Sequence, residues 1–304
     1  MKNYFEYARS LERILDEGMS IKSGAFGAEG GFAEKIASGS FCKNADLELP
    51  ERYKKCNKRA LVFAPHPDDE SIISALPLRL MAECGFSVCD AAVTLGSNKS
   101  RRSGRRAELE SACLYLGWDL RICGDDGFDG ISANERAANP EAWRKKAEYI
   151  AGLISGENPA AIFAPHKDDW NKTHVGTSLL VGDALSLLGD SYIGLLVSTE
   201  YWRPMHSANL LVELSADILG AQMTAISCHL KEVERNPYHI RLAALAIDNV
   251  RRGGEVVGGQ GSEAPDFKFG AIYNVSERCN GEYSDKFSSA FLSSDTNAIE
   301  IFRF

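Results

Sequence analysis

The feature that most constrains the fold is an alternation of short apolar runs and helical patterns over residues 59–199. The runs RALVFAP (59–65), which is apolar from Ala60 on, and AAIFAP (160–165) both end at proline, which is typical of strands buried on both faces. Between them, segments such as 71–83 repeat apolar residues at helical spacing, with Pro77 as a predicted kink. Strands that alternate with helices pair in parallel through right-handed crossovers. The sequence therefore predicts an α/β fold with a doubly wound, mostly parallel, Rossmann-like sheet and helices on both of its faces.

The last third of the chain is more elaborate, with two long helices expected over 216–235 and 238–252. Further strands are predicted over 86–95, 119–122, 192–199, 209–215 and 267–275, and further helices over 105–116, 141–155 and from about residue 173. Because no linker-like change of composition divides the chain, we expect one domain over 58–275, preceded by an extension over 1–57 and followed by a polar tail over 276–304.

Composition excludes several classes of protein. The chain has 42 acidic and 34 basic side chains, and a net charge of -8 argues against non-specific binding of nucleic acid. No apolar run approaches the roughly 20 residues of a membrane span, and the first residues lack the pattern of a signal peptide, so a cytoplasmic protein is expected. The eight cysteines include no CxxC pair, which disfavours a disulfide framework or a thiolate zinc site. The oligomeric state stays open, with a homo-oligomer as one alternative.

The tetrapeptide Phe-Ala-Pro-His occurs twice, at 63–66 and at 163–166, and each copy is followed by one residue and then two aspartates. Both copies end an apolar strand. Since the carboxyl ends of the strands surround the ligand crevice of an open α/β sheet, the two turns are expected to converge on one polar site. A single HPDD segment is compatible with ordinary turn and capping chemistry. The duplication, together with the nearby His174, favours a functional site.

A metal-binding pattern is present in the first copy. His66 and the carboxylate of Asp69, three residues later, can hold one cation. Catalytic zinc favours three protein ligands of nitrogen or oxygen type and one open position. His174, at the start of the helix that follows the second copy, is the candidate for the third ligand. The pattern predicts one divalent cation per chain, with zinc favoured.

Two segments resemble the signatures of a known family, the PIG-L or LmbE-like zinc N-deacetylases. The first is APHPDDE (64–70), which matches the family's (A/S)HPDDE, and the second is DWNKTH (169–174), a divergent form of D-x-H-P-D-H. The resemblance extends from residue 61 to about residue 275. It implies removal of the acetyl group from an N-acetylated amino-sugar conjugate of the N-acetylglucosamine type, with acetate and a free amine as products.

The resemblance also implies residue roles. It assigns His66, Asp69 and His174 to zinc and Asp68 to the general base. The chemistry agrees, because a carboxylate beside a metal-bound water, whose pKa falls toward about 7, can take its proton near neutral pH.

The second segment departs from the family at its first histidine, where this chain has Asn171. In the family that histidine assists the oxyanion and the leaving group. Asn171 can donate a hydrogen bond but cannot deliver a proton. His166, on the neighbouring turn, is the other candidate for this role; the alternative is that it is a structural histidine that caps the turn.

Candidate substrate contacts are less specific. By resemblance, Arg105 and Asp126 would contact the sugar, and Glu200 and Trp202 follow a strand end where an aromatic ring could stack on a sugar. Five cations follow the second predicted strand: Lys99, Arg101, Arg102, Arg105 and Arg106. They are consistent either with an anionic substrate group or with a solvated helix face.

Two other functions stay open at this point. One is a metallohydrolase of a different amide or of an ester, and the other is a metal-retaining carbohydrate-binding protein that has lost turnover. A dinucleotide-binding protein is disfavoured because no GxGxxG follows the first strand.

Overall fold

The computed structural model describes residues 4–20, 31–37 and 47–303. The strands are β1 (Asn57–Ala64), β2 (Ser87–Ala92), β3 (Asp119–Ile122), β4 (Pro159–Pro165), β5 (Gly194–Thr199), β6 (Leu210–Glu213), β7 (Gly270–Cys279), β8 (Glu282–Asp285) and β9 (Ala290–Leu292). The longer helices are α1 (Tyr4–Ser20), α4 (Ala75–Cys84), α5 (Arg102–Leu116), α7 (Pro140–Glu157), α8 (Lys172–Leu188), α9 (Ala216–Ser227) and α11 (Tyr238–Val256). The shorter ones are α2 (Phe32–Ala37), α3 (Asp69–Ile72), α6 (Ala133–Ala138), α10 (Leu230–Arg235), and the 3-10 turns η1 (Glu51–Tyr53), η2 (Lys99–Arg101), η3 (Gly189–Ser191) and η4 (Ala298–Phe302).

Within the described part of the chain, the strands form one sheet in the order β3-β2-β1-β4-β5-β7-β6-β9, with β8 paired to β7. Strands β3, β2, β1, β4 and β5 are parallel, whereas β7 runs antiparallel to β5 and β6. The chain builds outward in one direction through β1, β2 and β3 and in the other through β4 and β5. This is the predicted doubly wound α/β fold, and its topological switch point lies between β1 and β4.

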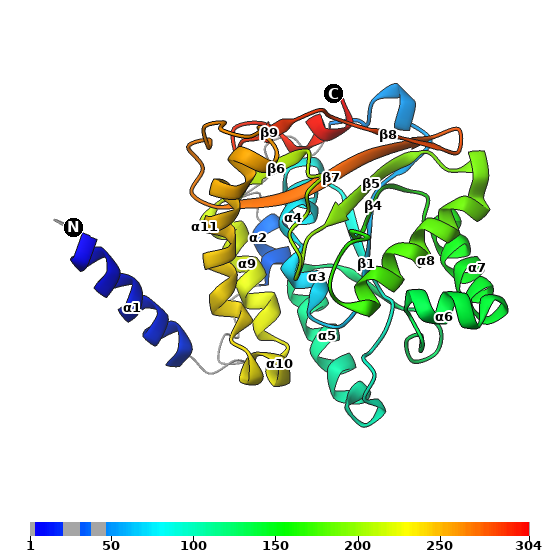
Figure 1. The fold of residues 1–304 in the computed structure, drawn as a ribbon, viewed down its shortest axis with the longest axis horizontal. Coiled ribbons are helices and arrows are strands. Elements are labelled where there is room, and N and C mark those ends of the chain that lie inside the picture. The colour runs from blue at the N-terminus through cyan, green and yellow to red at the C-terminus, as the bar shows by residue number, and fades with distance from the viewer. Residues whose placement is uncertain (1–3, 21–30, 38–46, 304) are drawn as a thin grey trace.

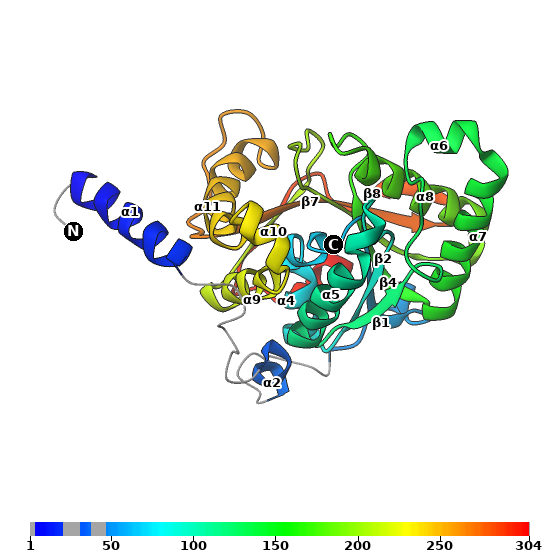
Figure 2. The ribbon, with the colours of Figure 1, turned by 90° about the horizontal axis from the view of Figure 1, so that it is seen from below.

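The sheet is covered on both faces because the buried stretches of its central strands, residues 60–64 of β1 and 159–165 of β4, are apolar. In β1, Leu61 and Phe63 pack into the core formed with α7 and α8, whereas Ala60 and Val62 pack into the opposite core with α4, α5 and α9. Successive side chains of a strand point to opposite faces, so a run of this kind can bury both. Figures 1 and 2 show α7 and α8 on one side of the sheet and the group of α4, α5 and α9 on the other.

Two predicted helices are divided. The helix predicted over 71–83 is two helices, α3 and α4, and Pro77 lies in the first turn of α4, where no helical partner for its missing N–H is needed. The prediction of a kink at Pro77 is therefore wrong. The helix predicted over 216–235 ends at Ser227 and resumes as α10, because His229 leaves helical geometry and pairs with a distant side chain described below.

The C-terminal segment extends the sheet, and the N-terminal segment places a helix at the edge of the molecule. β7 crosses the predicted boundary at residue 275, and β9 pairs with β6. Ile299 and Ile301 of η4 are buried in the core. Of the expected N-terminal extension, residues 21–30 and 38–46 lie outside the described residues, and α1 contacts α11 at the edge of the molecule (Figure 1). Among the described helices, none is long and apolar enough to cross a membrane.

Candidate active site

The two Phe-Ala-Pro-His segments end neighbouring strands. β1 and β4 pair in parallel, with Val62 opposite Phe163, so the turns that follow them emerge side by side at the switch point. The first turn leads into α3 and supplies His66 to Asp69. The second leads to α8, whose first turn supplies His174. The predicted convergence of two turns on one site is confirmed.

His66, Asp69 and His174 meet there, each offering one ligand atom within 4.8 Å of the others. Asp69 Oδ2 lies 3.1 Å from His66 Nδ1 and 3.1 Å from His174 Nε2. Asp69 and His174 are buried, and His66 is half-buried. The first turn of α8, which carries His174, packs closely against the backbone at Ile131. A Cβ on Gly176 would lie 2.5 Å from the backbone carbon of Ile131, so only glycine allows this approach.

The electrostatics of His174 fit a metal ligand. Its ring is fully buried, and neither nitrogen makes a hydrogen bond with any described residue. Burial lowers the pKa of His174, but the carboxylates of Asp69 and Asp169 outweigh this and raise it to about 10. Asp169 Oδ2 lies 3.6 Å from His174 Nδ1, on the side of the ring opposite to Asp69, which is the place of a carboxylate that orients a metal-bound imidazole. A buried imidazole that faces carboxylates on both sides, with a second histidine close by, fits a divalent cation.

Asp68 precedes this cluster in an uncommon backbone conformation. Its φ of 111° is rare for a residue other than glycine. The Asp68 N–H donates to Glu70 Oε2 at 2.8 Å, which holds this conformation in place. Burial and the neighbouring Asp69 raise the pKa of the Asp68 carboxyl well above its usual range, and Arg105, with Nη2 at 3.9 Å from Oδ1, opposes that rise.

Glu70 is itself held by a buried partner. His229 Nε2 lies 2.8 Å from Glu70 Oε1, and Ser71 Oγ donates to the same oxygen at 2.6 Å. Burial alone would raise the pKa of Glu70, but the neighbouring His229 has the larger effect and lowers that pKa. The same pairing raises the pKa of His229, although burial opposes the rise. The break between α9 and α10 thus delivers a histidine that supports the turn carrying Asp68.

We expect His229→Ala to lower the free energy of unfolding by about 3–5 kcal/mol, because removing one partner of a buried ionic pair leaves the other charge uncompensated. Denaturant unfolding measures this effect. His206→Ala is the matched control, because His206 is exposed. An unchanged unfolding free energy for His229→Ala would contradict the pairing with Glu70.

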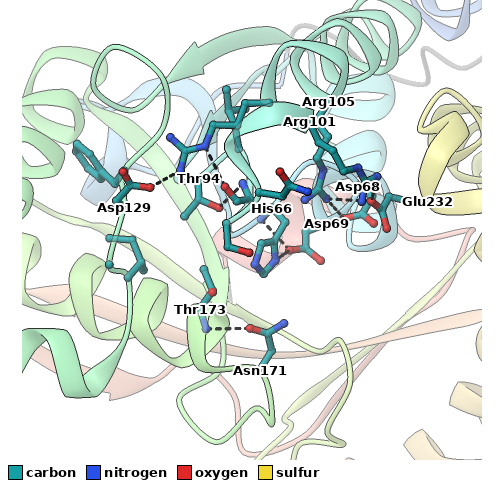
Figure 3. A pocket seen from close by; sticks show the side chains of 18 of the residues that line it. His66, Asp68, Asp69, Thr94, Arg101, Arg105, Asp129, Asn171, Thr173 and Glu232 are labelled. Atoms are coloured by element: carbon teal, nitrogen blue, oxygen red, sulfur yellow. Dashed lines mark hydrogen bonds and ion pairs between the residues drawn. The ribbon is translucent and has the colours of Figure 1, made fainter. Parts of the chain in front are cut away.

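The metal-type cluster opens into a cavity of ≈ 430 Å³, seen from close by in Figure 3. This volume lies within the range of about 300–1,000 Å³ typical of small-molecule sites. Of the predicted site residues, the cavity lining includes His66, Asp68, Asp69, Arg105, Asn171 and Trp202. His174 lies beneath it, in contact with Asp69.

His166 does not line this cavity. It is buried, its Nε2 lies 2.8 Å from the carbonyl oxygen of Arg203, and its Nδ1 accepts from the Asp168 N–H at 3.3 Å. Both ring nitrogens are therefore used within the protein. This geometry favours the structural alternative for His166 over a role at the oxyanion.

Asn171 does line the cavity and also begins α8. Its side-chain oxygen accepts from the Thr173 N–H at 2.8 Å, which is ordinary N-cap geometry. Among the described residues, the amide nitrogen of Asn171 has no hydrogen-bond partner, so it is free to donate to a ligand. Asn171 is thus the better placed of the two candidates.

Of the remaining predicted substrate contacts, one lines the cavity and two lie outside it. Glu200 binds Arg252 at 2.7 and 3.0 Å and accepts from the Met205 N–H, so it braces the structure outside the cavity. Asp126 is also outside the lining, with its exposed carboxylate 3.6 Å from Arg102. Trp202 lines the cavity, and its ring lies 5.4 Å from that of Tyr238.

Several cavity residues escaped the sequence analysis. Asp129 follows β3 in a loop without a motif, and Glu232, Arg235 and Tyr238 come from α10 and the start of α11. The sequence allows the two late helices to cover the site, but it assigns no role to these three side chains.

The fold and the geometry of the site together indicate a class of protein. A doubly wound sheet with a His-Asp-His cluster beside a further carboxylate at its switch point defines a candidate metallohydrolase. Residues 61–185 match the model of the PIG-L family, described as GlcNAc-PI de-N-acetylase. The matched residues include His66, Asp68, Asp69 and His174, and together with their geometry the match supports a deacetylase.

Solved structures share the fold at low identity. The conserved protein TT1542 from Thermus thermophilus is 23% identical, with a TM-score of 0.54, over 70% of this chain and 92% of that one. N,N'-diacetylchitobiose deacetylase from Pyrococcus horikoshii is 16% identical, with a TM-score of 0.52, over 80% and 92%. GalB, the 4-carboxy-2-hydroxymuconate hydratase from Pseudomonas putida, is 16% identical, with a TM-score of 0.52, over 71% and 95%. No curated protein sequence matches the chain.

Proposed function

We propose that this protein is a zinc-dependent hydrolase that removes the acetyl group from an N-acetylated amino sugar of the N-acetylglucosamine type. The observation that carries the proposal is the cluster of His66, Asp69 and His174, with Asp68 beside it, at a cavity of ≈ 430 Å³. The family description and the deacetylase of Pyrococcus horikoshii support the choice of an acetylated amino sugar.

Each side chain has a role in this proposal. His66, Asp69 and His174 hold the metal, which when bound supplies Lewis acidity for the acetamide carbonyl and lowers the pKa of water. Asp68 takes the proton from the attacking water and returns it to the departing amine. Burial and the neighbouring Asp69 raise the pKa of its carboxyl above the usual range, which favours the return of the proton.

Asn171 contributes the remaining polar group. Its amide nitrogen, which has no partner among the described residues, donates a hydrogen bond to the developing oxyanion. Since an amide cannot deliver a proton, the proton of the leaving group comes from Asp68 rather than from a histidine.

Trp202 supplies a wall for the sugar ring, because it lines the cavity beside Tyr238. We expect Trp202→Ala to raise KM by about 3- to 10-fold, the effect of losing one aromatic contact, with little change in kcat. Steady-state kinetics measure both constants. Trp170→Ala is the matched control, because Trp170 is 73% exposed and lies outside the cavity lining. A fall in kcat at constant KM would contradict a binding role for Trp202.

The test of the proposed function is the release of acetate by zinc-loaded protein. The panel contains N-acetylglucosamine, its methyl glycoside and N-acetylgalactosamine, with O-acetylated sugars and N-acetylated amino acids as competitors. We expect acetate and free amine in equal amounts from the amino sugars. Hydrolysis of the competitors alone would support the metallohydrolase alternative, and binding of zinc and sugar without any product would support the binding-protein alternative.

A further inference from the structure

Helix α1 exposes an apolar face that the rest of the chain does not cover. The helix is amphipathic, yet none of its 17 residues is buried. Tyr4 is 91% exposed, Phe5 77% and Ile14 59%. Contiguous exposed apolar surface marks an interaction site, whereas single exposed apolar side chains are ordinary. α1 also lies outside residues 61–185, which match the family model.

The apolar face of α1 forms one wall of a groove of ≈ 960 Å³, and α9 and α11 form the other wall. The two walls touch at one end, because a Cβ on Gly18 of α1 would lie 2.8 Å from Cδ1 of Ile240 of α11. Figures 1 and 2 show α1 separating from α11 toward the N-terminus of α1. The two helices therefore form an open V. Its walls carry apolar side chains, among them Leu11, Ile14 and Leu15 on α1, Met223 on α9, and Ala243, Ala244 and Ile247 on α11.

This V fits one further helix with an apolar stripe. The apolar side chains of α1 recur every three or four residues, at Tyr4, Tyr7, Leu11 and Ile14, which is the stripe of a helix that packs between other helices. The chain thus contains both the groove and a helix suited to it. Two copies related by a two-fold axis satisfy both at once, because each copy offers the same helix and the same groove to the other.

Charge distinguishes a second copy from a membrane surface. α1 carries four acidic and two basic side chains, whereas helices that lie on membranes are rich in lysine and arginine. The facing helix α11 carries three arginines and two acidic side chains. The excess charges of α1 and α11 are opposite in sign, which favours contact between them.

A polar group in the groove also lacks a partner. His239, at the start of α11, lines the groove, and neither of its ring nitrogens forms a hydrogen bond with any described residue. Burial lowers the pKa of His239, so its ring is neutral near pH 7 and offers one donor and one acceptor. An incoming α1 carries two phenol groups, on Tyr4 and Tyr7, that suit these positions.

We propose that two copies of this chain form a two-fold dimer in which α1 of each copy packs into the V of the other. Tyr4, Phe5 and Tyr7 are the anchors, and each aromatic side chain buries about 150–250 Å² when it is covered. Together with the aliphatic side chains of α1, they supply roughly the 800 Å² per partner of a standard interface. The dimer does not depend on the reaction that the protein catalyses.

Sedimentation equilibrium of the full-length protein tests this proposal. We expect a dimer as the main species at about 50 μM, since interfaces of this size bind with micromolar affinity or better. Ile14→Glu and Ile247→Glu should each raise the Kd of the dimer by about 30-fold or more, because each places a charge inside the interface. Both side chains are exposed in the single chain, at 59% and 49%, so far-UV circular dichroism should match wild type.

Leu114→Glu is the matched control, because Leu114 is 81% exposed on α5 and lies outside the groove lining. A dimer that survives Ile14→Glu and Ile247→Glu would overturn the proposal by placing the interface elsewhere. A dimer weakened by Ile14→Glu alone would overturn the packing of α1 into the groove, because α1 would then pair only with α1. A monomer at the highest concentration tested would also overturn the dimer. In that case, co-sedimentation with phosphatidylcholine vesicles, lost in Ile14→Glu, would assign the apolar face to a membrane surface instead.

Discussion

Replacing Asp68 by asparagine is expected to leave the bound metal at its wild-type amount and to lower kcat by a factor on the order of 10² to 10⁴. The amide has nearly the same size, but it cannot accept a proton from water. The uncommon backbone of Asp68 does not depend on its own carboxylate, because its N–H binds Glu70. Acetate release at saturating substrate, with metal analysis of the same sample, measures the two quantities together.

Asp168→Asn is the matched control for this substitution. Asp168 occupies the same position in the second Phe-Ala-Pro-His copy, yet it is exposed and outside the cavity lining. Its replacement is expected to leave kcat within about twofold of wild type, as for most exposed substitutions. Near-normal turnover by Asp68→Asn would show that the base lies elsewhere.

The second large effect is expected for His174→Ala. Loss of a residue that hydrogen-bonds to a metal ligand costs about 10- to 100-fold in metal affinity, and loss of the ligand His174 itself should cost more. Its ring lies 3.1 Å from Asp69 and is fully buried, so neither water nor a neighbouring side chain can easily replace it. Metal content after dialysis against a weak chelator measures the loss.

His166→Ala is the comparison for the metal site. Its ring binds the Arg203 carbonyl and the Asp168 N–H, so its removal is expected to preserve metal binding. Full metal content in His174→Ala, with loss in His166→Ala, would move the third ligand to His166.

The central part of the fold could be predicted from the sequence because its signals are local. The apolar runs of β1 and β4 bury both faces, and each ends in a proline and a polar turn. The meeting of His66, Asp69 and His174 could also be predicted, since parallel neighbouring strands deliver their following turns to one edge of the sheet.

The rest depends on contacts between distant segments. The break after α9 is set by the pairing of His229 with Glu70, and helical periodicity alone contains no trace of that partner. Glu232 lies on a predicted helix without a motif, yet its carboxylate is buried because it faces three arginines, Arg101, Arg105 and Arg235. The repeated motif makes His166 a candidate for the oxyanion role, but its ring contacts the carbonyl of Arg203, which no sequence pattern indicates.

The most direct test of the central claim is a titration of zinc into metal-free protein while acetate release from an N-acetylated amino sugar is followed. His66, Asp69 and His174 form the one metal-type cluster among the described residues, so the rate should rise in proportion to added zinc and reach its plateau at one equivalent per chain. Acetate release that is complete without metal and unaffected by a chelator would contradict the account.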